Sequence, residues 1–190
     1  MPAPAAVLTG LGSWLPTKVL DNHEIAARLD TSDEWIRTRT GIRERRVAGP
    51  GESTVDLAVE AGGARKRLSE HPADRFVAMQ GTAVFRHACA RMAESSRTVL
   101  DRAGWMVGDV DRFVGHQANI RILQATAKQL GMPADAVVAN IDRVGNTSAA
   151  SIPLALDRLL ETGGVHRGDQ VLLLGFGAGL TAAGQVVRCP

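Results

Sequence analysis

The chain has 190 residues and a mass of 20.1 kDa, which suits one domain with a hydrophobic core better than two small domains. Hydrophobic residues make up 45% of the sequence and charged residues 22%, so the composition excludes a disordered or fibrous protein. The formal net charge of +2 is nearly balanced and does not indicate nucleic-acid binding. The two cysteines are too few for a disulfide scaffold.

The location of the protein is predicted from its apolar segments. The longest apolar runs fall far short of the roughly 20 residues that a membrane-spanning helix needs. The first residues also lack the basic and apolar regions of a signal peptide. We therefore expect a cytoplasmic protein that does not span a membrane and whose thiols stay reduced.

The first third of the chain predicts a strand and two short helices. Residues 7–15 have the apolar pattern of a strand, and Pro16 prevents a helix directly after it. A helix fits residues 22–29 with Asn22 as its N-cap, and residues 32–36 have the pattern of the start of a second helix.

The sequence pattern then changes. A helical pattern at residues 54–61 is followed by two glycines, Gly62 and Gly63. The polar stretch of residues 64–75 comes next, and no strand pattern returns before Phe76. We therefore predict a junction between two portions of the chain in this stretch.

Alternating helices and strands are predicted for the rest of the chain. Strands are expected at residues 112–115, 137–141, 171–174 and 181–188. Helices are expected at residues 83–103 and 117–130, and a third helix is expected to run from a cap at Ser148 or Ser151 to residue 160. Gly104 and Gly131 are stop signals for the first two helices. This alternation indicates the α/β class.

A histidine and an asparagine stand out at the ends of predicted elements. His116 lies where a strand gives way to a helix, although a histidine there, taken alone, is more often a local hydrogen-bonding residue than a catalyst. Asn146 lies thirty residues later, in a turn ahead of a helix rich in small residues. An Asx turn or a helix cap is the alternative to a functional role for Asn146.

The motifs around these two residues, and their order, resemble those of the β-ketoacyl-acyl carrier protein synthase III family, which has the thiolase fold. The motifs are Val114-Gly-His-Gln-Ala-Asn-Ile-Arg121 and Asp142-Arg-Val-Gly-Asn-Thr-Ser-Ala-Ala-Ser151. The similarity also covers residues 8–16, residues 30–45 and nearly everything after Phe76. It implies a layered αβαβα fold, here incomplete, with an N-terminal segment of residues 1–62 and a C-terminal half of residues 63–190.

The resemblance implies a catalytic pair. His116 and Asn146 would donate hydrogen bonds to the thioester oxygen of malonyl-acyl carrier protein while decarboxylation builds enolate charge there. Neutral donors suit this task because they stabilise the oxyanion without supplying a proton that quenches the carbanion.

The turn of residues 175–179 resembles the family's glycine-rich turn, in which the backbone N–H of Ala178 would help to form a second oxyanion hole. A dinucleotide-binding loop would need a glycine where Leu180 stands, and the following segment has a strand pattern, so we reject that interpretation. A purely structural tight turn is the remaining alternative.

The resemblance also implies a coenzyme A site and a docking face for the carrier protein. The adenine end of coenzyme A would be held at Thr31, Trp35 and Arg39. The pantetheine tunnel would be lined by Thr82, Phe85 and Asn119. The basic docking face would include Arg121 and Lys128. Taken singly, core packing is the alternative for Trp35, and a solvated surface is the alternative for each cation.

The family's nucleophile, a cysteine at the start of a buried helix, has no counterpart in the sequence. Cys89 lies in the middle of a predicted helix and Cys189 follows the last predicted strand, so we interpret them as a buried small side chain and a terminal thiol. The central region with several core strands is therefore missing, by a true deletion or because the sequence is incomplete.

The expected function is the condensation of an acyl-CoA starter with malonyl-acyl carrier protein, which initiates fatty acid or polyketide synthesis. Acyl-CoA is then a substrate, no cofactor or metal is implied, and a homodimer is expected. The chain as it stands should not acylate itself. The alternative is a noncatalytic thiolase-fold remnant that binds coenzyme A or a partner subunit.

Overall fold

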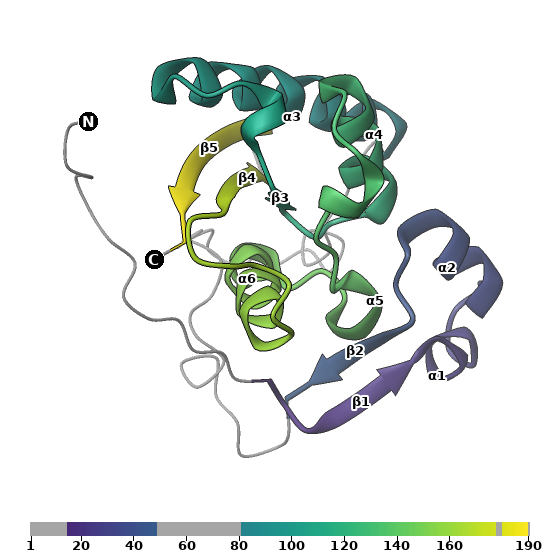
Figure 1. Cartoon of the computed structure of the whole chain (residues 1–190). Coiled ribbons are helices and arrows are strands. Elements are labelled where there is room, and N and C mark those ends of the chain that lie inside the picture. The colour runs from purple at the N-terminus through teal and green to yellow at the C-terminus, as the bar shows by residue number, and fades with distance from the viewer. Residues whose placement is uncertain (1–14, 49–80, 178–179, 190) are drawn as a thin grey trace, which may run out of the picture.

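A three-stranded sheet lies at the centre of the computed structural model, which describes residues 15–48, 81–177 and 180–189 (Figure 1). β3 (Arg112–Gly115) pairs in parallel with β4 (Gln170–Gly177), and β4 pairs antiparallel with β5 (Thr181–Arg188). The strands predicted at residues 112–115 and 181–188 are confirmed. The predicted strand at residues 171–174 is the buried part of β4, which extends three residues further.

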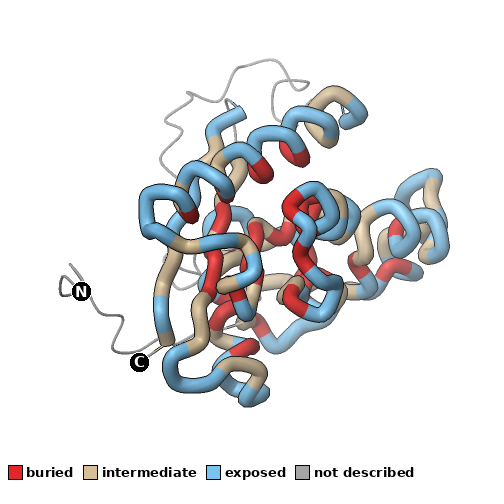
Figure 2. The backbone as a smooth tube through the Cα atoms, turned by 45° about the horizontal axis from the view of Figure 1, so that its top comes forward, coloured by how far each residue is buried: buried red, intermediate tan, exposed pale blue. Residues whose placement is uncertain are grey.

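Helices cover both faces of this sheet. α3 (Gly81–Ala103) and α4 (Ile120–Leu130) pack on one face, and α6 (Ser151–Glu161) packs on the other. Neighbouring residues of β3 alternate between the two faces: Phe113 belongs to the core cluster with α3 and α4, whereas Val114 belongs to the cluster with α6. Figure 2 shows the buried residues along these strands and on one side of the helices.

The ends of α3 and α4 follow the glycine signals in the sequence. α3 ends before Gly104, whose φ is 70°, and α4 ends at Gly131 in the left-handed conformation. α4 begins three residues later than predicted because Asn119 is its N-cap. The side-chain oxygen of Asn119 accepts a hydrogen bond from the backbone N–H of Arg121 at 2.9 Å.

The N-terminal described segment forms a small unit beside α4 (Figure 1). β1 (Lys18–Asp21) and β2 (Glu44–Val47) pair antiparallel, and α1 (Asn22–Ala26) and α2 (Asp33–Thr40) lie between them in the chain. The second helix begins where it was expected, and Ser32 is its N-cap, since its hydroxyl oxygen accepts from the backbone N–H of Trp35 at 3.1 Å.

The first helix begins at Asn22 as predicted, but the predictions of its N-cap and of its last residue are wrong. Its N-cap is Asp21, whose carboxylate accepts from the backbone N–H of Glu24, and the helix ends at Ala26 rather than at residue 29. Asn22 is buried instead, and its amide donates to the carboxylate of Asp33 and to the carbonyl of Ile42. These partners are distant in the sequence, so a local capping pattern could not reveal them.

Gly41 lets the N-terminal unit lie close against α4. It ends α2 in the left-handed conformation with a φ of 84°, which favours glycine. A Cβ at this position would lie 2.6 Å from Cγ2 and 2.8 Å from Cβ of Ile120, which is too close for any side chain. The contact between α2 and α4 therefore depends on a glycine.

The strand predicted at residues 137–141 is absent from the described part of the chain. One bridge joins Phe113 to Val137, a 3₁₀ turn covers Ala134–Ala136, and α5 (Ile141–Val144) begins where the strand should end. The side chain of Gln117 takes the place of further strand pairing: its amide donates to the carbonyl of Val138 at 3.2 Å, and its oxygen accepts from the backbone N–H of Asn140 at 3.2 Å.

The predicted start of the last helix also needs correction. Ser148 begins a 3₁₀ turn (Ser148–Ala150), and α6 starts at Ser151 with Ala150 at the cap position. Neither serine side chain caps α6, because Ser151 is fully buried and its hydroxyl is used elsewhere. The helix continues to Glu161, close to the predicted end.

Four sequence predictions lie outside the described residues. They are the helix at residues 54–61, the junction at residues 64–75, the strand pattern at Phe76 and the strand at residues 7–15, of which only Leu15 is described, without regular structure.

Gln117→Ala should destabilise the fold by roughly 1–3 kcal/mol, because it leaves the backbone groups of Val138 and Asn140 without these partners. Gln117 is fully buried, so water cannot replace the lost amide without opening the core. Urea unfolding measures the change, and Gln124→Ala, at an exposed position of α4, is the control. Equal stability of the two variants would contradict this role of Gln117.

Candidate active site

His116 sits at the carboxyl end of the parallel strand pair. It follows β3 directly, and its backbone N–H donates to the carbonyl of Leu174 on β4 at 2.8 Å. This bond extends the pairing of β3 and β4 by one residue and fixes the backbone that carries the imidazole. Ligands of parallel sheets bind at this edge, so the position suits a functional side chain.

The imidazole of His116 is half-buried and held on one side. Its Nδ1 lies 2.6 Å from the hydroxyl oxygen of Ser151, the first residue of α6. Burial lowers the pKa of His116 below the ordinary value of an imidazole, and the backbone of Ser148, which interacts with the ring, opposes this shift. The imidazole is therefore neutral at pH 7, as a hydrogen-bond donor to an oxyanion should be.

Asn146 lies in the loop between α5 and α6, after Gly145, whose φ is 70°. Its side-chain oxygen accepts a hydrogen bond from the backbone N–H of Ser148 at 2.9 Å, which is the Asx turn that the sequence left open. The turn uses only the oxygen. Within the described residues, the amide NH₂ of Asn146 has no hydrogen-bond partner, and the residue is exposed.

Ser148 and Ser151 connect the loop of residues 145–151 to His116. Ser148 holds the oxygen of Asn146 through its N–H, and its backbone interacts with the imidazole. Ser151 holds Nδ1 of the same ring. The structure therefore brings this loop, including the residue two positions after Asn146, against the histidine.

The glycine-rich turn is described only at its two ends. β4 ends at Gly177, β5 begins at Thr181, and Leu180 has a positive φ of 55°. Ala178, the expected donor of the second oxyanion hole, lies outside the described residues. The two strands pair as an antiparallel hairpin, and no helix follows the turn, which agrees with our rejection of a dinucleotide-binding loop.

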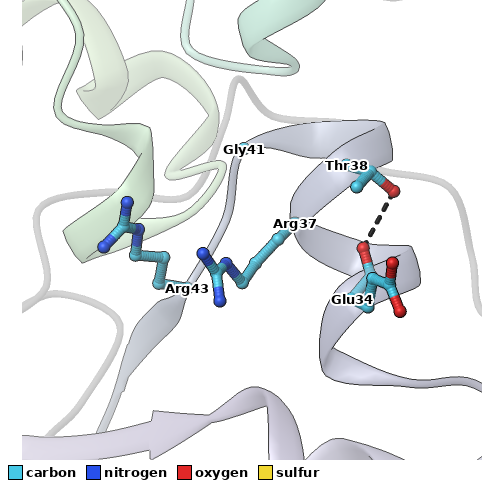
Figure 3. A pocket seen from close by; sticks show the side chains of 5 residues that line it. All are labelled: Glu34, Arg37, Thr38, Gly41 and Arg43. Carbon is cyan, nitrogen blue, oxygen red and sulfur yellow. Dashed lines mark hydrogen bonds between the residues drawn. The ribbon is translucent and has the colours of Figure 1, made fainter.

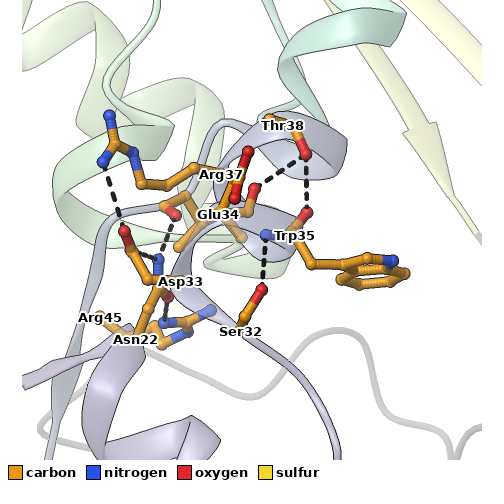
Figure 4. A network of polar contacts seen from close by, with 9 residues as sticks. Asn22, Ser32, Asp33, Glu34, Trp35, Arg37, Thr38 and Arg45 are labelled. Atoms are coloured by element: carbon orange, nitrogen blue, oxygen red, sulfur yellow. Dashed lines mark hydrogen bonds and ion pairs between the residues drawn. The ribbon is translucent and has the colours of Figure 1, made fainter.

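α2 presents the indole ring of Trp35 on its surface (Figure 4). Trp35 is 56% exposed, so the alternative of core packing is wrong for this residue. The guanidinium carbon of Arg39 lies 5.9 Å from the centroid of the indole ring, within the range of a cation–π contact. Thr31 precedes the helix, and its buried hydroxyl has no partner within the described part of the chain.

A second group of the expected binding residues lies on α3 and α4. Phe85 is half-buried against the main core, and the guanidinium carbon of Arg121 lies 5.4 Å from the centroid of its ring. Thr82 is exposed in the first turn of α3, and Lys128 is exposed one heptad after Arg121. Asn119, expected to line the tunnel, is the N-cap of α4.

Two hollows lie near these groups. One of about 330 Å³ is lined by residues of α2 and the segment after it: Glu34, Arg37, Thr38, Gly41 and Arg43 (Figure 3). The other, of about 530 Å³, lies between α4 and residues 131–139 and includes Lys128 in its wall. Neither of these two hollows is lined by His116 or Asn146.

The two cysteines are not activated thiols. Cys89 is buried in α3, and burial raises the pKa of its thiol. The pKa of Cys189 is also raised, first by burial and then by the negative charges of Asp169 and Asp111. A raised pKa disfavours the thiolate, so neither residue fits a nucleophile.

Two negative findings concern the described residues alone. Among them there is no cluster of three or more histidine, cysteine or carboxylate side chains that could hold a metal ion. No helix among them is both long enough and apolar enough to cross a membrane.

Sequence comparisons identify the family. Residues 100–189 match the family model described as 3-oxoacyl-[acyl-carrier-protein (ACP)] synthase III C terminal. β-Ketoacyl-[acyl-carrier-protein] synthase III 5 of Streptomyces coelicolor is 52% identical to the chain, over 93% of this chain and 95% of that protein. The chain belongs to the β-ketoacyl-acyl carrier protein synthase III family. The resemblance stated from the motifs is confirmed.

Solved structures of the synthase III family share the fold. The synthase III of Thermus thermophilus matches with a TM-score of 0.83 and 25% identity, over 93% of this chain and 97% of that chain. The priming β-ketosynthase of the R1128 polyketide pathway matches with a TM-score of 0.82 and 26% identity, over 95% of both chains. The predicted α/β class with a thiolase-like fold is therefore confirmed.

The comparison with the Streptomyces synthase also shows how much of the family sequence is absent. The alignment runs over 316 positions, whereas this chain has 190 residues, so at least 126 positions have no counterpart here. Because the alignment covers nearly all of both proteins, these positions are internal. The prediction that a large inner part is missing is confirmed, while the boundary between residues 62 and 63 stays a prediction.

Proposed function

We propose that this chain carries the decarboxylating half of a β-ketoacyl-acyl carrier protein synthase III site, with His116 and Asn146 as its two hydrogen-bond donors. The observation that carries the proposal is the loop of residues 145–151. Through Ser148 and Ser151 it engages the imidazole, and it holds the oxygen of Asn146, which leaves the amide NH₂ without a hydrogen-bond partner among the described residues.

The two donors would act on the thioester carbonyl of malonyl-acyl carrier protein. The bond between the malonyl α-carbon and its carboxylate breaks, carbon dioxide leaves, and the electron pair moves into an enolate whose charge collects on the thioester oxygen. Nε2–H of His116 and the NH₂ of Asn146 would donate to that oxygen. The thioester accepts the electron pair itself, so this step requires no cofactor or metal.

In the complete family reaction, the enolate would attack an acyl group that coenzyme A has delivered to a cysteine, in the initiation of fatty acid or polyketide synthesis. The raised pKa values of Cys89 and Cys189 argue against either as that nucleophile. We therefore expect the 190-residue chain to decarboxylate malonyl-acyl carrier protein without acylating itself.

The test uses the purified chain, after intact mass confirms 20.1 kDa. It is incubated first with radiolabelled acetyl-CoA and then with malonyl-acyl carrier protein labelled in the free carboxylate. Release of labelled carbon dioxide without protein-bound acetate is the expected result. Stable labelling of a cysteine would contradict the claim that this chain lacks a nucleophile. Failure to release carbon dioxide would contradict the proposed decarboxylating half-site.

A second candidate is a noncatalytic member of the family that binds coenzyme A or a partner subunit. The surface pair of Trp35 and Arg39 favours it, because an exposed indole and a fixed cation suit an adenine nucleotide whether or not chemistry follows. In both candidates, we assign Thr31, Trp35 and Arg39 to the adenine end and Thr82, Phe85 and Asn119 to the pantetheine arm.

Trp35→Ala should weaken the binding of coenzyme A by roughly 1–3 kcal/mol, because the adenine loses its stacking partner. Isothermal titration calorimetry with coenzyme A measures the change. Leu29→Ala is the control, since Leu29 is a large exposed apolar side chain in the same small unit. Unchanged affinity in Trp35→Ala would refute this assignment of the indole.

The remaining partners are proposed by analogy with the family. Arg121 and Lys128 are exposed on α4, where they would meet the acidic carrier protein, and Arg121 is partly held by Phe85. We also propose a homodimer and a cytoplasmic location.

A further inference from the structure

The hydroxyl of Ser151 makes two hydrogen bonds that end on consecutive residues. Its oxygen lies 2.6 Å from Nδ1 of His116 and accepts from the backbone N–H of Gln117 at 3.2 Å. Ser151 is fully buried as the first residue of α6, so water does not compete for either bond. One side chain thus contacts both the imidazole and the backbone that follows it.

The position of the hydroxyl proton follows from what each partner can do. A backbone N–H can only donate, so the bond from Gln117 uses a lone pair of the serine oxygen. Of the two partners of this oxygen within the described residues, only Nδ1 of His116 can accept the serine proton. If Nδ1 itself carried a proton, the buried hydroxyl of Ser151 would be left without an acceptor there, which is unfavourable.

We infer that Ser151 is a positioning residue that donates its hydroxyl proton to Nδ1 of His116 and thereby holds the neutral imidazole as the Nε2–H tautomer. The inference rests on the proposed function only for its consequence: Nε2–H is the donor that the enolate oxygen needs. The contact with Gln117 fixes the serine oxygen against the end of β3, so the ring is fixed in orientation as well as in tautomer.

The backbone of Ser148 also interacts with the ring, and this interaction raises the pKa of His116 against the effect of burial. If Nδ1 rather than Nε2 carried the proton of the neutral ring, Nε2 would be an acceptor. An acceptor cannot stabilise an oxyanion, so the two arrangements differ in chemistry as well as in spectroscopy.

Long-range ¹H–¹⁵N correlation spectroscopy of the histidine-labelled chain tests the inference, because it distinguishes a protonated ring nitrogen from a bare one. The chain has five histidines, and the spectrum of His116→Gln assigns the signals of His116. The expected result for the unmodified chain above the pKa of His116 is a protonated Nε2 and a bare Nδ1. A protonated Nδ1 overturns the inference without any need for a serine variant.

The variants then test whether Ser151 is the cause. Ser151→Ala should give a mixture of the two tautomers, and Ser151→Thr, which keeps the hydroxyl, should restore Nε2–H. Ser95→Ala, in α3 and without a hydrogen bond to His116, is the control. If Ser151→Ala is folded by circular dichroism and still shows only Nε2–H, Ser151 does not set the tautomer.

The catalytic readout is separate from the spectroscopic one. Ser151→Ala should lower kcat for malonyl decarboxylation by about tenfold, the order expected when one supporting hydrogen bond is lost, with KM unchanged. If the chain releases no carbon dioxide but shows the expected tautomers, the proposed function fails and this inference stands. If it releases carbon dioxide with Nδ1 protonated, the inference fails, and the decarboxylating activity stands without Nε2–H of His116 as a donor.

Discussion

Replacement of His116 by alanine should slow the decarboxylation of malonyl-acyl carrier protein by about 100- to 1,000-fold, the effect of removing one preorganised donor from an oxyanion site. The reason is local: the imidazole is neutral because burial lowers its pKa, and it is fixed by Ser151. The rate of carbon dioxide release at saturating substrate measures the loss.

His87→Ala is the matched control, since His87 is exposed on α3. His116→Gln is a useful second variant, because its amide can donate and should recover part of the rate. If the His116→Ala protein is folded and as active as the His87→Ala protein, the imidazole of His116 has no role in the reaction. The proposed pairing of His116 with Asn146 would then fail as well.

Phe113→Ala should cost about 3–5 kcal/mol of stability, the largest effect expected of a single core change in the described part of the chain. The ring is fully buried in the cluster that joins β3 to α3 and α4. A Cβ on Gly115 would lie 3.0 Å from Cζ of this ring, so the ring also occupies the space beside that glycine. Little else can fill the cavity without moving β3.

Urea unfolding followed by circular dichroism measures the change, and Met106→Ala is the control because Met106 is 72% exposed. A loss of less than about 1 kcal/mol in Phe113→Ala would mean that the core collapses around the missing ring. Because β3 carries His116 at its end, we also expect the variant to lose more decarboxylation activity than its remaining folded fraction accounts for.

Elements with strong local signals were predictable from the sequence. β3 and β5 lie where the apolar pattern places them, and α3 and α4 end at Gly104 and Gly131 because a left-handed residue ends a helix whatever surrounds it. The errors have tertiary causes. Gln117 satisfies backbone groups of residues 138 and 140 that a strand would otherwise pair, and it does so across more than twenty residues of sequence.

The candidate site, too, was predictable from the sequence only where its signals are local. The motifs around His116 and Asn146 were visible because they are contiguous in the sequence, and the Asx turn of Asn146 was a local alternative that is present alongside its proposed role. Ser151 was treated only as a possible helix cap. Its buried hydroxyl contacts a ring 35 residues away, and only the folded chain brings the two together.

The contact that Gly41 permits has a consequence for substitutions far from His116. It joins α2 directly to Ile120, in the first turn of the helix that follows His116. Within the described residues, the helix that carries Trp35 is thus packed against the helix that begins just after the imidazole. A larger residue at position 41 would push α2, and with it the indole of Trp35, away from α4.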